Sequence, residues 1–353
     1  MLVIAARQRK TIQAPEPPGS GLPASGVNQV EFFHSVNIDW LRLKWYFLGF
    51  SMIFSVAGII SMGMHIARIG SPVPLGVDFR GGTQVQVRFN QPPDMNSIRS
   101  ATEAAGIHDA RIQAIRGLDE SGGSEVLISL PEQHDETSLD VGRQRIVDAL
   151  HAHYNNPFVV RNVQVVGPTV GRQLERQAGL ATLYSMVGML IYLWFRFQLI
   201  YGVAAVVACF HDTLITVGAF ALTNQEISLT VIAAILTLVG YSMNDTIVVF
   251  DRIRENLRLN RRETLPDVVN RSINQTLSRT VLTSGLTFLT VLSLYIFGGQ
   301  VLRGFSFALV IGILIGTYSS IAVASPMLVA YQEWRAKSGK ATATLPPAKR
   351  ARV

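Results

Sequence analysis

The sequence is poor in charge, and this scarcity limits the class of protein that it can encode. Only 16% of its 353 residues are charged, whereas 48% are hydrophobic. Soluble domains of this length usually carry more charge and less apolar surface. The composition therefore predicts a membrane protein.

Cysteine is nearly absent, and the common phosphate-binding patterns are missing. The single cysteine, Cys209, excludes an intrachain disulfide and lies in an apolar stretch, where packing is its expected role. No GxGxxG pattern opens a helix and no GxxxxGKS/T pattern occurs, which disfavours ATP-driven transport within this chain. We expect no enzymatic activity, no metal and no cofactor, so the energy for any transport must come from elsewhere.

Long apolar runs are what the sequence has in abundance. Each is long enough to cross the hydrocarbon layer as a helix, in some cases with tilt. An even number of spans places both termini on the same side of the membrane. We predict six spans, at residues 46–66, 178–195, 199–223, 227–250, 280–297 and 304–331.

The distribution of basic residues predicts the orientation of these spans. The connection 251–279 carries seven arginines, whereas residues 224–226 carry none. The positive-inside rule then makes the Arg-rich connection and both termini cytoplasmic, with Arg303 as the one discordant charge. Because the net charge of +7 is gathered beside apolar segments, we expect membrane lipid and not nucleic acid as the basic residues' partner. The polar arms 1–39 and 332–353 are expected to be disordered.

Residues 67–177 replace continuous apolar runs with alternation, which is typical of a folded domain outside the membrane. Residues 83–89, 111–116, 125–130 and 159–166 read as strands, while 96–105 and 138–154 read as helices. The resulting order, βαββαβ, predicts a ferredoxin-like α+β domain with two helices on one face of a four-stranded sheet. The topology makes this domain extracytoplasmic.

The Arg-rich connection also contains a helix signal. Thr264, Pro266 and Asp267 form a typical helix start. We predict a surface helix that runs into the fifth span and carries Arg279 to the lipid boundary, where its long side chain can approach buried carboxylates.

The fourth predicted span contains the carboxylate of Asp245, beside Asn244. An acid within a span costs roughly 2.5–3.5 kcal/mol on insertion scales, so it is expected to face a protein interior and to serve a function. We favour a role as a proton carrier. The alternative is a structural acid satisfied by a helix neighbour near the cytoplasmic interface, since Asp251 and Arg252 follow within about two turns.

Two further polar groups lie in spans. His211 and Asp212 in the third span could relay protons or bond a neighbouring helix, and the sequence does not decide between these roles. A hydrolytic metal site on this pair is disfavoured, because no further ligands occur at metal-binding spacing. Gly312 and Gly316 form a GxxxG pair in the last span, which is typical of close helix packing.

Glycine-rich segments flank the predicted domain. The segment 76–84, GVDFRGGTQ, contains Asp78, Gly81 and Gly82, and its paired glycines are typical of a tight turn entering a strand.

Six motifs in order on six spans carry a resemblance to a known family. GVDFRGGT, VGPTVG with Gly167, Pro168 and Gly171, HDTLITVGAF, LTVIAAILTLVGYSMNDTIVVFDRIREN, SRT and IGTYSSIAVASPML together resemble the SecF family of bacterial protein-export subunits. The resemblance covers residues 39–331. Two positions depart from the family pattern, because Arg303 stands near a frequent acidic position and Gln173 replaces a frequent glutamate.

The resemblance implies a function that the residues alone do not. SecF-family proteins pair with SecD to complete a twelve-span bundle related to RND transporters, and they assist the SecYEG translocon, with YajC as a further candidate partner. The bundle is expected to use the proton gradient to promote late steps of preprotein export across the inner membrane, while the extracytoplasmic domain holds the unfolded preprotein. Asp245 corresponds to the family's essential acid and Arg279 to its arginine at the fifth span.

Two other functions stay open. Half of an RND-type small-molecule exporter would share the acid-bearing span, although such exporters normally carry twelve spans in one chain. A passive scaffold for translocon subunits would need no acid at all.

Overall fold

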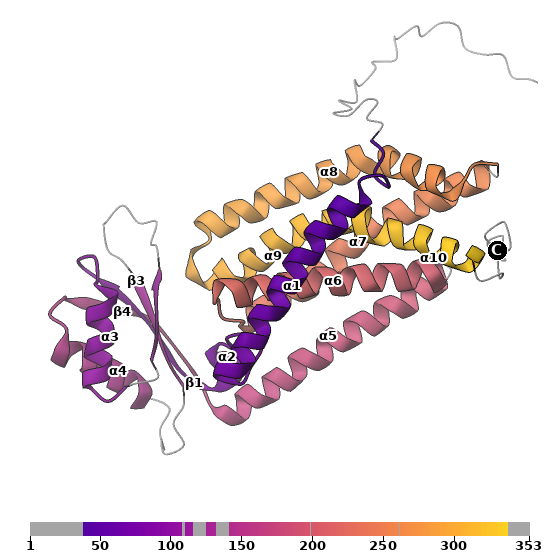
Figure 1. Cartoon of the computed structure of the whole chain (residues 1–353). Coiled ribbons are helices and arrows are strands. Elements are labelled where there is room, and N and C mark those ends of the chain that lie inside the picture. Colours follow the sequence, from indigo (N-terminus) through magenta and orange to yellow (C-terminus); the bar gives the residue numbers. More distant parts are fainter. Residues whose placement is uncertain are drawn as a thin grey trace, which may run out of the picture. The chain divides into compact units, whose positions relative to one another are not determined.

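The computed structural model describes residues 38–107, 110–115, 125–131, 141–197, 199–260 and 262–337. Almost all of the predicted polar arm, and the tail from residue 338 onward, lie outside these residues. Within them, six helices are long and apolar enough to cross a membrane, as predicted. Figure 1 shows these helices packed along one another. They are α1 (Lys44–Ile69), α5 (Pro168–Arg196), α6 (Leu199–Thr223), α7 (Leu229–Leu259), α8 (Leu265–Phe297) and α9 (Gly299–Ser319), the last continued by the π-helix η1 (Ser320–Ala324) and α10 (Ser325–Lys337).

Several helices extend beyond the predicted apolar runs. The connection predicted at 251–279 is mostly helical, because α7 continues to Leu259 and α8 begins at Leu265. The cap forms at the predicted residue, where Thr264 accepts a hydrogen bond from the backbone N–H of Asp267. The predicted surface helix and the fifth span are one continuous helix. Likewise α10 reaches Lys337, so the first residues of the tail predicted to be disordered are helical. The backbone hydrogen bonds of a helix do not depend on the polarity of its side chains, so the helix continues past the end of the apolar run.

The domain between α1 and α5 is ferredoxin-like, as predicted. The antiparallel sheet has the order β2-β3-β1-β4, and the central strand pairs Val85 with Ile128 on one side and with Val163 on the other. Both domain helices lie on one side of the sheet (Figure 1). The elements are α2 (Val77–Arg80), β1 (Gly82–Phe89), α3 (Met95–Ala104), β2 (Arg111–Ile115), β3 (Glu125–Pro131), α4 (Val141–His153) and β4 (Phe158–Val166).

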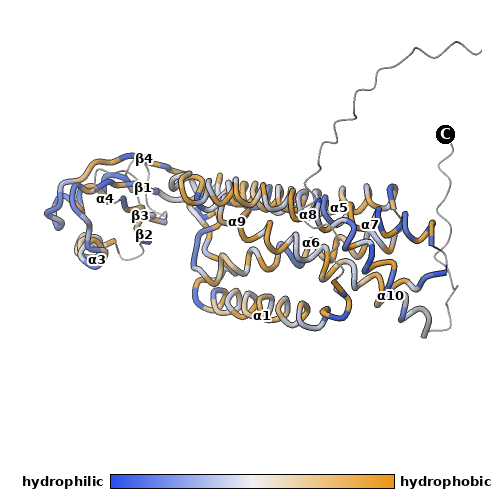
Figure 2. Tube along the Cα trace, turned by 90° about the horizontal axis from the view of Figure 1, so that it is seen from above, coloured by the Kyte–Doolittle hydropathy of each residue, from blue (hydrophilic) through white to orange (hydrophobic). Residues whose placement is uncertain are grey.

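The six long helices differ in how far this chain encloses them. Half or more of the most apolar window is buried in α6, α7 and the last span, but only 17% in α1 and α8 and 6% in α5. Figure 2 shows hydrophobic residues along the length of these helices, with hydrophilic ones frequent in the sheet domain. The helices α1, α5 and α8 therefore present their apolar faces to lipid or to another protein.

Candidate functional site

Asp245 lies on the inward face of α7. Leu238, Ser242, Asp245 and Val249 recur at spacings of three or four residues, and all four are buried. Asp245 is only 3% exposed, and the hydroxyl of Ser284 on α8 donates to its Oδ2 at 2.8 Å. The carboxylate is therefore enclosed between α7 and α8 and held by a neutral donor.

The charged groups near Asp245 do not pair with it directly. Arg279 on α8 is exposed and interacts electrostatically with Asp245, but no ion pair joins the two side chains. Asp251 pairs with Arg196 at 3.3 Å, and Arg252 pairs with Glu255 at 2.7 Å. These charges that follow Asp245 on α7 thus have partners on α5 or within α7, and they do not neutralise the buried acid.

A second carboxylate lies deeper in the bundle. Asp212 on α6 is 1% exposed and accepts from the hydroxyls of Ser242 at 2.6 Å and Ser319 at 2.7 Å. Nδ1 of His211 lies 3.0 Å from its other oxygen, and Nε2 of the same ring is hydrogen-bonded to Ser51 on α1. The pair in the third span therefore bonds α1, α7 and α9 at once. This geometry fits the neighbour-bonding role and also provides a chain of exchangeable protons.

Serines that the sequence pattern did not indicate lie beside both acids. Ser51, Ser242, Ser284 and Ser319 are all buried, and each donates to or shares a hydrogen bond with a titratable side chain. Hydroxyls in spans usually bond their own backbone four residues earlier, as Thr213 does with Cys209. Their inward helical spacing relative to the two acids is the signal that could have revealed them.

Asp212, Asp245 and the serines bonded to them form what we call the polar layer. The last span contains a π-helical turn beside this layer. Ser320, the first residue of η1, contacts the hydroxyl of Thr246 at 3.4 Å, and Ser325 donates to the carbonyl of Ser320 at 2.9 Å. All five residues of η1 are buried. Single π-helical turns within α-helices are frequent at functional sites, because they disturb the regular bonding of the helix.

Gly312 and Gly316 face α7. A side-chain carbon at Gly316 would lie 3.1 Å from Cβ of Ser242, and one at Gly312 would lie 2.4 Å from the side chain of Leu238. The GxxxG pair therefore lets α9 approach α7 where Ser242 and Ser319 meet Asp212. Its effect is to position the polar layer.

Asn244 lies outside this layer. It is exposed on α7 and falls on a stripe of exposed, small or polar residues with Ala233, Thr237 and Gly240. Neighbouring residues on a helix point about 100° apart, so Asp245 faces inward while Asn244 faces outward. Asn244, predicted to act with Asp245, therefore lies on a different face of the helix from that buried acid.

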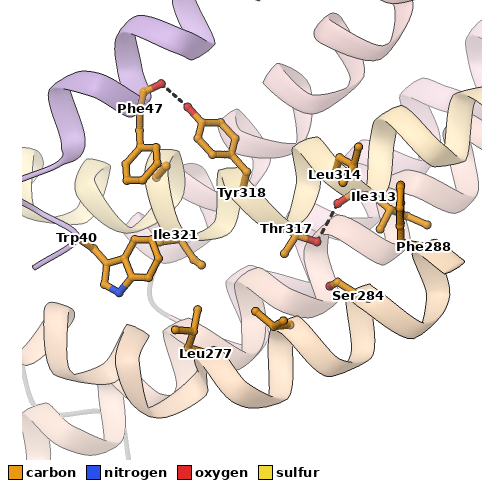
Figure 3. A pocket seen from close by; sticks show the side chains of 13 residues that line it. Trp40, Phe47, Leu277, Ser284, Phe288, Ile313, Leu314, Thr317, Tyr318 and Ile321 are labelled. Atoms are coloured by element: carbon orange, nitrogen blue, oxygen red, sulfur yellow. Dashed lines mark hydrogen bonds between the residues drawn. The ribbon is translucent and has the colours of Figure 1, made fainter. Parts of the chain in front are cut away.

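An apolar cavity of about 360 Å³ adjoins the site. It lies among α1, α8 and the last span, with Trp40, Phe47, Leu277 and Ile321 in its wall (Figure 3). Ser284 also lines it, so the donor that holds Asp245 borders a space large enough for an apolar group.

The glycine motifs lie at the root of the ferredoxin-like domain. Gly81 and Gly82 are buried and have φ angles of 77° and 129°, which residues with side chains rarely adopt. A side-chain carbon at Gly171 would lie 2.6 Å from the carbonyl oxygen of Phe79, so α5 can pass the turn only with glycine there. Gly167 and Pro168 form the start of α5.

Asp78 occupies the same root and is 7% exposed. Its Oδ1 accepts from Gln164 in β4 at 2.5 Å, and its Oδ2 accepts from the backbone N–H of Leu229 in α7 at 2.8 Å. The residue therefore contacts both the domain and the helix that carries Asp245.

Comparison with known proteins gives consistent matches along the chain. The family model for the protein export membrane protein SecD/SecF C-terminal region matches residues 146–334, and the model for the SecD/SecF GG motif matches residues 69–93. Protein translocase subunit SecF of Koribacter versatilis is 53% identical, over 90% of this chain and 96% of that protein. The same subunit of Desulfurispirillum indicum is 44% identical, over 83% of this chain and 91% of that protein.

A solved structure shares the fold. The crystal structure of SecDF, a translocon-associated membrane protein from Thermus thermophilus, superposes with a TM-score of 0.74 at 36% identity. The match covers 85% of this chain but only 39% of the SecDF chain. The chain described here thus corresponds to less than half of that protein.

Proposed function

Because this chain belongs to the SecF family of protein translocase subunits, we propose that it works with SecD to convert the proton-motive force into late-stage movement of preproteins. The preprotein passes through the SecYEG translocon, with YajC as a further candidate partner, and crosses the cytoplasmic membrane. The chain performs no chemical catalysis and needs no cofactor. Its termini face the cytoplasm, and the ferredoxin-like domain faces outward, where it holds the unfolded chain.

The single observation that carries this proposal is the buried carboxylate of Asp245. It is 3% exposed and is bonded to a neutral hydroxyl, with no directly paired cation. Such a group can hold a proton in one helix arrangement and release it to water in another. One charge crossing 100 mV is worth about 2.3 kcal/mol, which is enough to bias a two-state movement of a few kcal/mol.

A second bundle fits against this one. The helices α1, α5 and α8 are poorly enclosed, and α7 exposes the stripe of Ala233, Thr237, Gly240 and Asn244. Small residues allow close helix approach, and an amide in the membrane requires a hydrogen-bonding partner. SecD provides the complementary bundle, so that the buried acids lie inside a twelve-span assembly.

The test is a pulse-chase of a secreted reporter in cells whose only copy of this gene is the wild type or the Asp245→Asn variant. Asparagine keeps the size and polarity of the side chain but cannot exchange a proton. We expect the variant to export slowly, and collapse of the proton gradient to slow only the wild type. Equal export rates with equal gradient dependence would overturn the proposal and would favour a passive scaffold.

The apolar cavity gives a specific reason to test the second candidate, which is half of a small-molecule exporter. Trp40 lies in its wall, so a hydrophobic compound bound there would quench tryptophan fluorescence. Saturable quenching that is lost in Trp40→Phe, together with normal reporter export by Asp245→Asn, would favour the exporter.

A further inference from the structure

The helix that carries Asp245 is capped by a residue from another part of the chain. Ser228 stands at the N-cap of α7 but makes no side-chain capping bond. Asp78, 151 residues earlier, accepts from the N–H of Leu229 instead. The free N–H groups and the positive end of the helix dipole favour a carboxylate at this position.

Three more contacts join the domain to the same end of α7. The backbone N–H of Gly76 donates to the carbonyl of Ile227 at 2.9 Å, and the N–H of Ile227 donates to the carbonyl of Pro74 at 2.8 Å. Nε of Arg111, in strand β2, lies 3.1 Å from a carboxylate oxygen of Glu226. We call these contacts, together with the bond from Leu229 to Asp78, the α7 joint.

The charged pair in the joint is largely shielded from water. The side chain of Glu226 is 14% exposed, and that of Arg111 is 30% exposed. Burial raises the pKa of Glu226, while the nearby charge of Arg111 opposes that change. A pair of this kind resists separation, because either ion left alone would remain partly buried without a counter-charge.

The covalent connections of the domain run to α1 and α5, so the α7 joint is a separate link to α7. This helix is unbroken over 31 residues, and about 24 Å of it separates Leu229 from Asp245. Asp245 and Leu229 therefore belong to one continuous helix, which can carry a displacement from one residue to the other.

We infer that the α7 joint makes the ferredoxin-like domain move with α7, and that Asp78 is the positioning residue that transmits this movement. The inference rests on the proposed function, since it needs proton exchange at Asp245. It adds the route by which the exchange is converted into movement of the domain.

The test uses the full chain with its SecD partner and the SecYEG translocon in proteoliposomes, and it measures amide exchange, proton flux and reporter export together. In Asp78→Ala, the amide of Leu229 at the start of α7 should exchange about tenfold faster, because it loses a charged acceptor. Proton flux should stay at the wild-type level, whereas export should fall to the rate seen without a gradient. Wild-type export by Asp78→Ala would overturn the inference.

Asp94→Ala is the matched control. Asp94 also caps a helix, since it accepts from the backbone N–H groups of Asn96 and Ser97 at the start of α3. That helix lies wholly within the domain. The control should therefore loosen α3 and leave export unchanged, and a loss of export equal to that of Asp78→Ala would contradict a special role for the joint.

A cross-link separates a broken joint from a misfolded domain. A side-chain carbon at Gly76 would lie 3.7 Å from Cα of Ser228, so Gly76→Cys with Ser228→Cys can bridge the joint on a Cys209→Ala background. Oxidation should restore export to Asp78→Ala, and reduction should remove it again. Failure of the cross-link to restore export would overturn the inference.

The proposed function fails by a different result. If export by the wild type is equally fast with and without a proton gradient, the proposed function is wrong, whatever the amide-exchange measurement shows.

Discussion

The ferredoxin-like domain and the helical bundle bury different kinds of side chain. The domain core consists of apolar residues such as Val85, Phe89, Ile98 and Ile146, each 0% exposed. The bundle buries two carboxylates and several serines, in addition to many apolar side chains. The domain interior therefore provides stability, whereas the bundle interior also provides groups that can exchange protons.

The solvent around each region explains this difference. In water, burial of apolar surface drives folding of the domain. In lipid, helices gain little from hiding apolar surface, so close packing and interhelical hydrogen bonds hold them together. A polar layer in the bundle can therefore contribute to assembly and to function.

The largest effect on stability should come from the domain core. Phe89 is fully buried, and its ring contacts those of Tyr154 and Phe158 at centroid distances of 5.3 and 5.9 Å. Phe89→Ala should destabilise the domain by about 3–5 kcal/mol, because it loses transfer free energy and leaves a cavity. Hydrogen exchange of strand β1 in the full chain measures this. Val159→Ala, at an exposed position on β4, should change exchange little, and equal effects of the two substitutions would contradict the comparison.

The next largest loss of stability should come from a substitution at the boundary between the two regions. Gly171→Ala places a carbon 2.6 Å from a backbone oxygen, which the chain can relieve only by shifting α5 or α2. We expect a loss of about 1–3 kcal/mol in thermal unfolding of the purified chain. Gly179→Ala on the same helix meets nothing within 4 Å and should be neutral or slightly stabilising. If both glycines tolerate alanine equally, the close approach is not a constraint.

Within the bundle, removal of one hydroxyl should affect function more than stability. Ser284→Ala deletes the donor to Asp245 and should cost about 0.5–1.5 kcal/mol of stability. It should also change the pH dependence of export, because the Asp245 side chain loses the one hydrogen-bond partner that it has among the described residues. Ser306→Ala is the control, since this buried serine bonds the carbonyl of Leu302 in its own helix. Identical pH profiles for the two variants would argue against a role for Ser284.

The smallest effect should be a loss of stability of helix α3 at acidic pH. Bonds from the Ser97 hydroxyl and the Asn96 N–H lower the pKa of Asp94 below its ordinary value of 3.8. A lowered pKa in the folded state adds stability that is fully present above the unfolded value and is lost as the pH falls through the folded value. Protection of the α3 amides, which compares their exchange rate with that of an unstructured peptide at the same pH, should therefore fall only below about pH 3.8, and Asp94→Asn should remove that step. A step at higher pH would contradict the assignment.

Much of the fold follows from local patterns in the sequence. Continuous apolar runs identified the six spans, and alternation identified the strands, because each pattern reflects the medium that a face meets. The start of α8 agrees with the capping signal at Thr264, whereas α7 continues to Leu259, beyond the end of its apolar run. The outer turns of α7, around Glu255, are polar, and hydropathy does not identify a helix that continues into water.

The candidate site was only partly predictable for a different reason. Asp245 was conspicuous because a carboxylate is rare in a span, whereas Ser284 is ordinary in sequence and significant only through its position opposite that acid. The bond from Asp78 to Leu229 crosses 151 residues, so no local pattern could indicate it. Asn244 was grouped with Asp245 by adjacency, although helix geometry turns the two side chains apart.

The proposed function requires the carboxyl group of Asp245 to gain and lose a proton. Difference infrared spectra of the reconstituted complex, recorded as the pH is stepped, report the C=O band of a protonated buried carboxyl directly. We predict a pH-dependent band that disappears in Asp245→Asn and persists in Ser306→Ala. A band that is unchanged in Asp245→Asn would contradict the account.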